Sequence, residues 1–146
     1  MADHIRIGVL SLSSQSSSDP PAVEEQSPVF RCGGISYLHI PSQNSLQSAM
    51  FYQQVFGWKV RTEADHASFE DGTGHVIGAW VPDRSPSGNT GILPYVYVDN
   101  IDQVLAQVSA HGGEVVRPPY PEGDLRVATF SDPSGTVMGV WQRPRK

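Results

Sequence analysis

Apolar residues recur at helical spacing in two stretches of the chain, and an asparagine precedes each stretch. The first follows Asn44 and ends at Gly57, and the second runs from Ile101 to Ala110 after Asn100. Asparagine is a common helix N-cap and glycine a common helix end. Apolar residues three and four positions apart share a helix face. The sequence therefore predicts two helices whose apolar residues fall at helical spacing: Leu46, Ala49, Met50, Val55 and Phe56 in the first, and Ile101, Val104, Leu105 and Val108 in the second.

Around each helix, short runs rich in β-branched and aromatic residues predict strands, one before the helix and three after it. A polar linker, residues 83–90, separates the two groups. Strands are expected at 35–41, 58–63, 66–70 and 74–81, and again at 92–98, 114–118, 125–131 and 136–142. Each half is thus a predicted βαβββ module. One module alone leaves a sheet face and edges exposed, so we expect the two to pair.

A repeated segment supports this division into halves. Residues 69–80 and 130–141 align without a gap, and identical residues match at six positions: Phe69 and Phe130, Asp71 and Asp132, Gly74 and Gly135, Val76 and Val137, Gly78 and Gly139, Trp80 and Trp141. An internal repeat identifies the modules of an architecture and the positions that correspond between them. The alignment predicts that a symmetric site would use the same positions of both halves.

Length and composition indicate one compact domain. The chain has 146 residues, of which 38% are hydrophobic, which suits a single domain at residues 31–146 with module one at 33–82 and module two at 91–142. The first thirty residues differ, because residues 11–18 contain six serines and two prolines follow at 20–21. Such a composition has little to bury, so residues 1–30 are expected to form a flexible Ser/Pro-rich tail.

Charge and cysteine content exclude several classes of partner. The net charge of −5 arises from 15 acidic and 10 basic residues, and no run of Lys and Arg occurs. Nucleic-acid binding and membrane binding are therefore not expected, and no apolar run is long enough to span a bilayer. The single Cys32 cannot form an intramolecular disulfide, which favours a reducing compartment and a cytoplasmic protein.

The chain resembles the vicinal oxygen chelate superfamily, which includes glyoxalase I, bleomycin-resistance proteins and extradiol dioxygenases. The resemblance covers residues 33–142 and rests on YLHIP at 37–41, FY and VFGW at 51–58, VDNID at 98–102 and DPSG at 132–135. It implies an α+β fold in which two βαβββ modules pair into a U-shaped mixed-sheet half-barrel, the glyoxalase/bleomycin resistance/dihydroxybiphenyl dioxygenase-like fold. It also implies a homodimer with its site inside the half-barrel.

The resemblance implies four metal-ligand positions as well, one on the first and one on the last strand of each module. These positions fall on Tyr37, Gly78, Leu93 and Gly139. None is a carboxylate or an imidazole, and only the tyrosine carries a donor atom, whereas divalent metal sites need several such groups. We therefore expect no metal and no other cofactor.

Side-chain alternation predicts what lies on the same face instead. Residues two apart along a strand point the same way, which gives an aromatic and apolar cup with polar tips, the usual form of a small-molecule site. The expected ligand-binding residues are Tyr37, His39, Gly78, Trp80, Leu93, Tyr95, Tyr97, Gly139 and Trp141. The two glycines would leave room for a flat molecule, and His39 is the candidate catalytic acid or base.

Each of these residues also has a purely structural interpretation. The tryptophans fit a core or a dimer interface, the glycines fit close packing of the two modules, and His39 fits a hydrogen-bonded structural histidine. Three functions therefore stay open. The leading one is a protein that binds a small, flat, partly apolar molecule without metal. The alternatives are an enzyme of the lyase, isomerase or dioxygenase type, using a relocated metal or His39, and a dimeric scaffold whose cup is filled by its own side chains.

Overall fold

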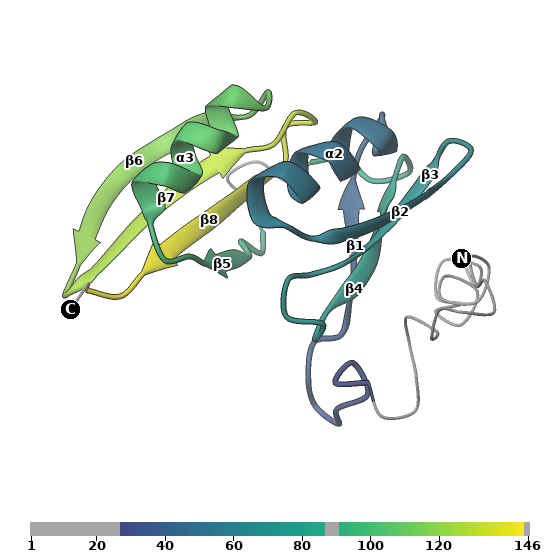
Figure 1. Cartoon of the computed structure of the whole chain (residues 1–146), viewed down its shortest axis with the longest axis horizontal. Coiled ribbons are helices and arrows are strands. Elements are labelled where there is room, and N and C mark those ends of the chain that lie inside the picture. Colours follow the sequence, from purple (N-terminus) through teal and green to yellow (C-terminus); the bar gives the residue numbers. More distant parts are fainter. Residues whose placement is uncertain (1–26, 87–90, 145–146) are drawn as a thin grey trace.

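The computed structural model describes residues 27–86 and 91–144, and the remaining residues of the expected tail and linker lie outside the described part. Both modules have the predicted βαβββ order (Figure 1). The first consists of β1 (Tyr37–Pro41), α2 (Ser45–Phe56), β2 (Lys59–Glu63), β3 (His66–Glu70) and β4 (Ile77–Val81). The second consists of β5 (Tyr95–Tyr97), α3 (Ile101–Ala110), β6 (Glu114–Glu122), β7 (Leu125–Ser131) and β8 (Val137–Gln142).

Each module forms one four-stranded mixed sheet. The strand order is β1-β4-β3-β2 in the first sheet and β5-β8-β7-β6 in the second. The first and last strands of each module pair in parallel, and the other neighbours pair antiparallel. A parallel pair needs a long crossover connection, and in each module the helix and the two following strands supply it. The α+β class predicted from the sequence is confirmed.

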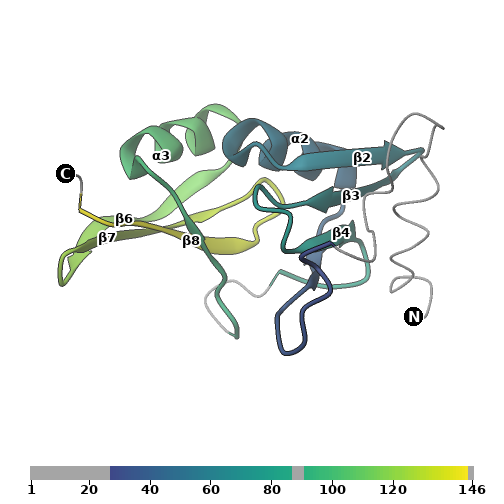
Figure 2. The same cartoon turned by 60° about the horizontal axis from the view of Figure 1, so that its bottom comes forward.

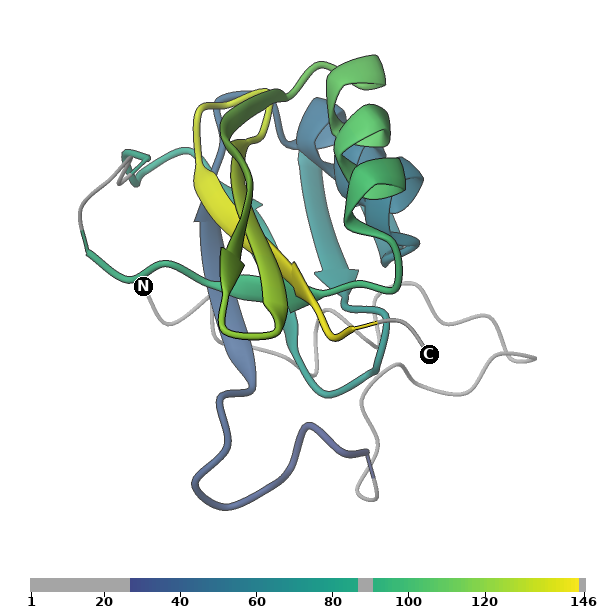
Figure 3. The same ribbon diagram turned by 90° about the vertical axis from the view of Figure 1, so that its left-hand side faces the viewer.

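One helix covers one face of each sheet, and both helices lie on the same side of the molecule. The helix α2 packs on β2, β3 and β4, and α3 packs on β6, β7 and β8. Figure 2 shows the two helices side by side above the strands, and the end-on view of Figure 3 shows the strands on the opposite side. We call the other face of each sheet, which no helix covers, the helix-free face. The predicted cup would lie on this face.

A buried aromatic cluster joins the two modules beneath the helices. The ring of Phe130 on β7 lies 6.1 Å from Phe51 and 5.8 Å from Phe56, both on α2. The hydroxyl of Tyr52, a residue with no exposed surface, donates a hydrogen bond of 2.9 Å to Asp132 Oδ2. Because Tyr52 belongs to the first module and Asp132 to the second, this hydrogen bond and the ring packing hold the modules together.

The turns before the last strand of each module differ by one residue. The Asp71 N–H donates to Val76 O in the first module, five positions on, whereas the Asp132 N–H donates to Thr136 O in the second, four positions on. Both turns contain a glycine with positive φ three residues after the aspartate, Gly74 at 79° and Gly135 at 93°. The extra residue of the first turn therefore lies between this glycine and β4.

This single residue changes which side chains share a face. Phe69 pairs with Gly78 across the first hairpin, but Phe130 pairs with Met138, not Gly139, across the second. A shift of one residue moves every following side chain to the other face of a strand. The gapless alignment of the sequence repeat is thus wrong beyond the turn, because Trp80 corresponds in space to Val140, and Trp141 corresponds to Val81.

Candidate functional site

Aromatic side chains gather on the helix-free face of the second sheet. Tyr95 pairs with Gly139, and Tyr97 pairs with Trp141, so all four residues share that face as predicted. The rings of Tyr97 and Trp141 meet edge to face with 4.9 Å between centroids. Tyr95 and Tyr97 are 46% and 42% exposed. Exposed aromatic residues clustered on one face mark a binding surface more often than scattered ones do.

Gly139 is required by the ring of Tyr95. A Cβ atom at Gly139 would lie 2.3 Å from the Tyr95 ring, which is far inside van der Waals contact. The space at Gly139 is therefore filled by the protein's own tyrosine. The same holds for Gly78, where a Cβ would lie 2.1 Å from Leu38 O and 2.5 Å from the Phe69 ring. The prediction that the two glycines leave room for a flat ligand is wrong for both positions.

Two arginines lie against tyrosines of this aromatic face. The guanidinium carbon of Arg117 lies 3.5 Å from the ring centroid of Tyr120, and Arg143 Nε donates to the Tyr97 hydroxyl over 3.3 Å. Burial, and then the neighbouring Tyr120 and Glu122, raise the pKa of the Tyr95 hydroxyl. Tyr95 therefore stays protonated at neutral pH and can act as a hydrogen-bond donor.

Sequence reasoning missed Tyr120 and Arg143 as members of this face. The predicted strand ended at residue 118, but β6 continues to Glu122, which brings Tyr120 beside Val127 of β7. Three prolines at 118, 119 and 121 obscured the strand. Prolines are tolerated on an edge strand, and β6 is at the edge of its sheet.

The first sheet has a smaller set of the predicted residues on its helix-free face. Tyr37 and His39 lie two apart on β1, both half-buried, and their rings meet edge to face with 5.4 Å between centroids. Burial raises the pKa of the Tyr37 hydroxyl. Leu93, the predicted partner position in the second module, precedes β5 and is half-buried.

Gly78 and Trp80 lie on the opposite, helix-covered face, and their predicted place in the cup is wrong. Gly78 pairs with Phe69, and Trp80, which is 3% exposed, lies 5.7 Å from the Tyr52 ring and 4.9 Å from the Phe69 ring. Both neighbours belong to the buried core. The cause is the extra residue of the first turn. Because of it, Ile77 and Ala79, rather than Gly78 and Trp80, lie on the helix-free face.

The four positions that the resemblance implies for a metal do not fit a divalent ion. Tyr37 is the one residue of ligand type among them, and Gly78 lies on the wrong face. Within residues 27–86 and 91–144, no group of three or more His, Cys, Asp and Glu side chains could hold a metal ion. Zinc, iron and magnesium sites require several such donors, and these four positions offer one.

The order of the strands and the paired modules define the class as a two-module α+β protein. Residues 34–139 match the sequence model of the Glyoxalase/Bleomycin resistance protein/Dioxygenase superfamily, and the chain belongs to this family. The family assignment made from the sequence is confirmed. None of the helices in the described ranges is long and apolar enough to cross a membrane.

Three known proteins illustrate the relationship. The putative glyoxylase CFP32 of Mycobacterium tuberculosis is 28% identical over 126 residues, which is 80% of this chain and 48% of the relative. The anthracycline biosynthesis protein DnrV of Streptomyces peucetius is 26% identical over 134 residues, with coverages of 78% and 48%. The crystal structure of TnmS3, an antibiotic binding protein from Streptomyces sp. CB03234, superposes with a TM-score of 0.59 at 20% identity, covering 76% of this chain and 96% of that one. The chain spans about half the length of the two curated relatives.

Proposed function

We propose that this protein binds a small, flat, partly apolar molecule on the helix-free face of the second sheet, without a metal ion. The observation that carries the proposal is the aromatic group formed by the exposed Tyr95 and Tyr97 and the half-buried Trp141. Aromatic faces stack on flat ligands and supply much of the binding free energy. The Tyr95 hydroxyl and the Arg117 guanidinium are available to orient polar substituents of the ligand.

The name of one relative supports a flat ligand, and the name of another supports a small-molecule ligand. DnrV is named for anthracycline biosynthesis, and anthracyclines contain a planar fused-ring system; TnmS3 is named an antibiotic binding protein. Tyr37 and His39 stay in the proposal as polar groups on the corresponding face of the first sheet. A homodimer and a cytoplasmic location are also expected, the first because the family resemblance implies it and the second because the single Cys32 favours a reducing compartment. Light scattering during gel filtration tests the dimer.

A fluorescence titration with a water-soluble anthraquinone tests the binding proposal. Quenching of tryptophan fluorescence should saturate and should be the same with and without EDTA. Tyr95→Ala and Trp141→Ala should each weaken binding about tenfold, which corresponds to about 1.4 kcal/mol and lies in the range for a lost aromatic contact. Val115→Ala is the matched control, because it removes a 38% exposed apolar side chain paired with Phe130 on the other face.

Two results would contradict the proposal. Equal affinity of the wild type and both aromatic variants would show that the probe binds elsewhere. Loss of binding in EDTA, restored by zinc, would instead favour a family enzyme with a relocated metal. His39→Ala and Tyr37→Phe, measured in the same titration, decide whether the first sheet contributes to the site.

A further inference from the structure

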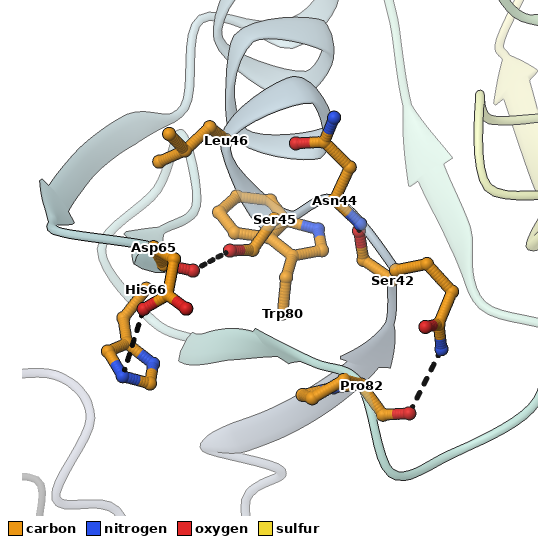
Figure 4. A pocket seen from close by; sticks show the side chains of 9 residues that line it. Ser42, Asn44, Ser45, Leu46, Asp65, His66, Trp80 and Pro82 are labelled. Atoms are coloured by element: carbon orange, nitrogen blue, oxygen red, sulfur yellow. Dashed lines mark hydrogen bonds and ion pairs between the residues drawn. The ribbon is translucent and has the colours of Figure 1, made fainter.

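A pocket lies at the beginning of α2, on the covered side of the first sheet and apart from the aromatic face. Its volume is 220 Å³, and it is formed where α2 begins, β2 turns into β3 and β4 ends (Figure 4). The pocket is lined by Ser42, Gln43, Asn44, Ser45, Leu46, Asp65, His66, Trp80 and Pro82. The lining combines an apolar part, Leu46, Trp80 and Pro82, with the polar start of a twelve-residue helix.

The second module shows what fills the equivalent place there. The Ile101 N–H, the first of α3, donates a hydrogen bond of 2.7 Å to Gln142 Oε1 at the end of β8. Equivalent backbone hydrogen bonds, Ser42 N to Val81 O and Val98 N to Trp141 O, fix the correspondence between the modules. Ile101 therefore corresponds to Ser45, and Gln142 corresponds to Pro82.

Proline has no side-chain acceptor, so the first module lacks this internal cap. The N–H groups of the first helical turn have no acceptor within the helix. Asn44 Oδ1 accepts from the Gln47 N–H at 3.1 Å, which leaves the N–H groups of Ser45 and Leu46. Among the described residues, no side chain takes the place of Gln142 for Ser45. The helix also has no acidic residue in its first turn, whereas α3 has Asp102.

A second, independent donor belongs to the same pocket. Trp80 is 3% exposed, and its Nε1 is buried with no hydrogen-bond acceptor among the described residues. Figure 4 shows the indole nitrogen turned toward Ser42 and Asn44, at the start of α2. Leaving a buried donor without an acceptor destabilises the fold, and a bound oxygen atom would remove this cost.

We propose that this pocket binds the carboxylate of a small organic acid. The Ser45 and Leu46 N–H groups and the Trp80 indole N–H donate to its oxygens, and the partial positive charge of the helix N-terminus favours an anion over a neutral carbonyl. The hydrocarbon part of the acid lies against Leu46, Trp80 and Pro82. At the rim, Asp65 and His66 are 91% and 85% exposed and lie 3.4 Å apart, so the carboxylate of Asp65 is screened by water and dissolved salt.

Amide NMR spectroscopy of the full chain tests the proposal, with sodium butyrate as the probe and sodium chloride at equal ionic strength as the reference. The Ser45 and Leu46 amide signals and the Trp80 indole signal should shift saturably with butyrate. The Ile101 amide, already capped by Gln142, should stay in place. Trp80→Phe assigns the indole signal among the three tryptophans of the chain.

A pair of variants at one position sharpens the test. Pro82→Gln supplies the amide acceptor of the second module and should weaken butyrate binding at least tenfold. Pro82→Ala also relaxes the backbone and removes part of the apolar wall but adds no acceptor, so it should weaken butyrate binding by about threefold or less. The proposal is overturned if the three signals do not saturate, if Ile101 shifts in parallel with them as for an adventitious ion only, or if both variants bind alike.

Discussion

The two modules share their order of elements, the asparagine N-caps of their helices and six identical positions in a repeated segment, yet the side chains of their last strands lie on exchanged faces. Trp80 is buried under α2, whereas Trp141 lies half-buried on the helix-free face beside Tyr97. One additional residue in the first turn causes the exchange. A repeat in sequence thus gives symmetric positions in space only if the turns between the strands have equal length.

The exchange also gives the two modules different roles. The first module has most of its large aromatic residues in the core, where Tyr52, Trp58, Phe69 and Trp80 form one packed group. The second has only Phe130 of its aromatic residues there and keeps its tyrosines and Trp141 outside. The aromatic residues of the first module therefore stabilise the fold, and those of the second are available to a ligand.

Replacing each of the two corresponding tryptophans of the sequence repeat with alanine should give the largest difference. Trp80 is 3% exposed within the core, whereas Trp141 is half-buried on the helix-free face. Losing a buried aromatic side chain costs about 3–5 kcal/mol, so Trp80→Ala should lower the free energy of unfolding by urea by about this amount. Trp141→Ala should lower it by about 1 kcal/mol, because its side chain is already partly in water. Equal losses for the two variants would contradict the face assignment.

Replacing the central glycine of each module with alanine should give the next largest difference in stability. Gly78→Ala places a Cβ against the backbone oxygen of Leu38, which cannot move aside, and should cost about 3 kcal/mol. Gly139→Ala meets only the ring of Tyr95, which is exposed and can rotate away, and should cost about 1 kcal/mol. The same variant should weaken anthraquinone binding, because Tyr95 leaves its position. Urea unfolding of both variants checks the order, and a larger loss for Gly139→Ala would refute it.

The two turn aspartates give a smaller contrast. Asp132 is 3% exposed and accepts hydrogen bonds from the Tyr52 hydroxyl and from the N–H groups of Ser134 and Thr136. Asp71 accepts comparable backbone hydrogen bonds in a more exposed turn. Asp132→Ala should cost about 2–3 kcal/mol and Asp71→Ala about 1 kcal/mol, because only the first leaves buried donors unsatisfied. Thermal unfolding of both variants checks this, and similar shifts would contradict it.

Asp132 should also change stability with pH. Burial raises the pKa of its carboxyl above 3.8, although hydrogen bonds from Tyr52 and the turn oppose this effect. The folded state therefore holds the proton more tightly than the unfolded state does. This contribution to stability is complete below pH 3.8 and is lost as the pH rises through the folded-state pKa. As the pH rises, the free energy of unfolding of the wild type should fall relative to that of Asp132→Asn, by about 1.4 kcal/mol for each tenfold difference in proton affinity between the folded and unfolded states. If the melting temperatures of the two proteins change in parallel from pH 3.5 to 7, this effect is excluded.

The smallest effect is expected for the ion pair of the second module. Arg126 binds both carboxylate oxygens of Asp102 at 2.9 and 3.2 Å on the surface, in the first turn of α3. Asp102→Asn should lower the free energy of unfolding by about 0.5 kcal/mol or less, and the difference should vanish in 1 M salt. A loss above 1 kcal/mol that persists in salt would show a structural role for the pair.

Much of the fold could be predicted because local signals in the sequence agree with it. Asn44 and Asn100 cap their helices as expected, accepting from the Gln47 and Gln103 N–H groups at 3.1 Å each. The second helix has its predicted bounds, and Gly57 ends the first with φ 73°. These features depend on residues within one turn of the chain, so the sequence pattern contains them.

The candidate site could be predicted only in part, because it depends on contacts between distant residues. The faces of Tyr95, Tyr97 and Trp141 followed from alternation within single strands. The face of Trp80 could not be predicted in this way. Both turns have an aspartate and a glycine at the same spacing, so the sequence does not indicate the extra residue of the first turn. The cap of Ile101 by Gln142 joins residues 41 positions apart, and no local pattern indicates its loss at Pro82.

The hydrogen bond between Tyr52 and Asp132 has a consequence for dividing the chain. A fragment that ends before residue 91 would expose the Tyr52 hydroxyl and the Phe51 ring, and a fragment that begins there would leave Asp132 hydrated and the Phe130 ring uncovered. Each fragment then carries a surface complementary to the other. If each half is attached to one of two interacting proteins, the halves should recover their native contact when those proteins bind each other. The chain would then act as a split reporter, in which the burial of Tyr52 signals that the halves have joined.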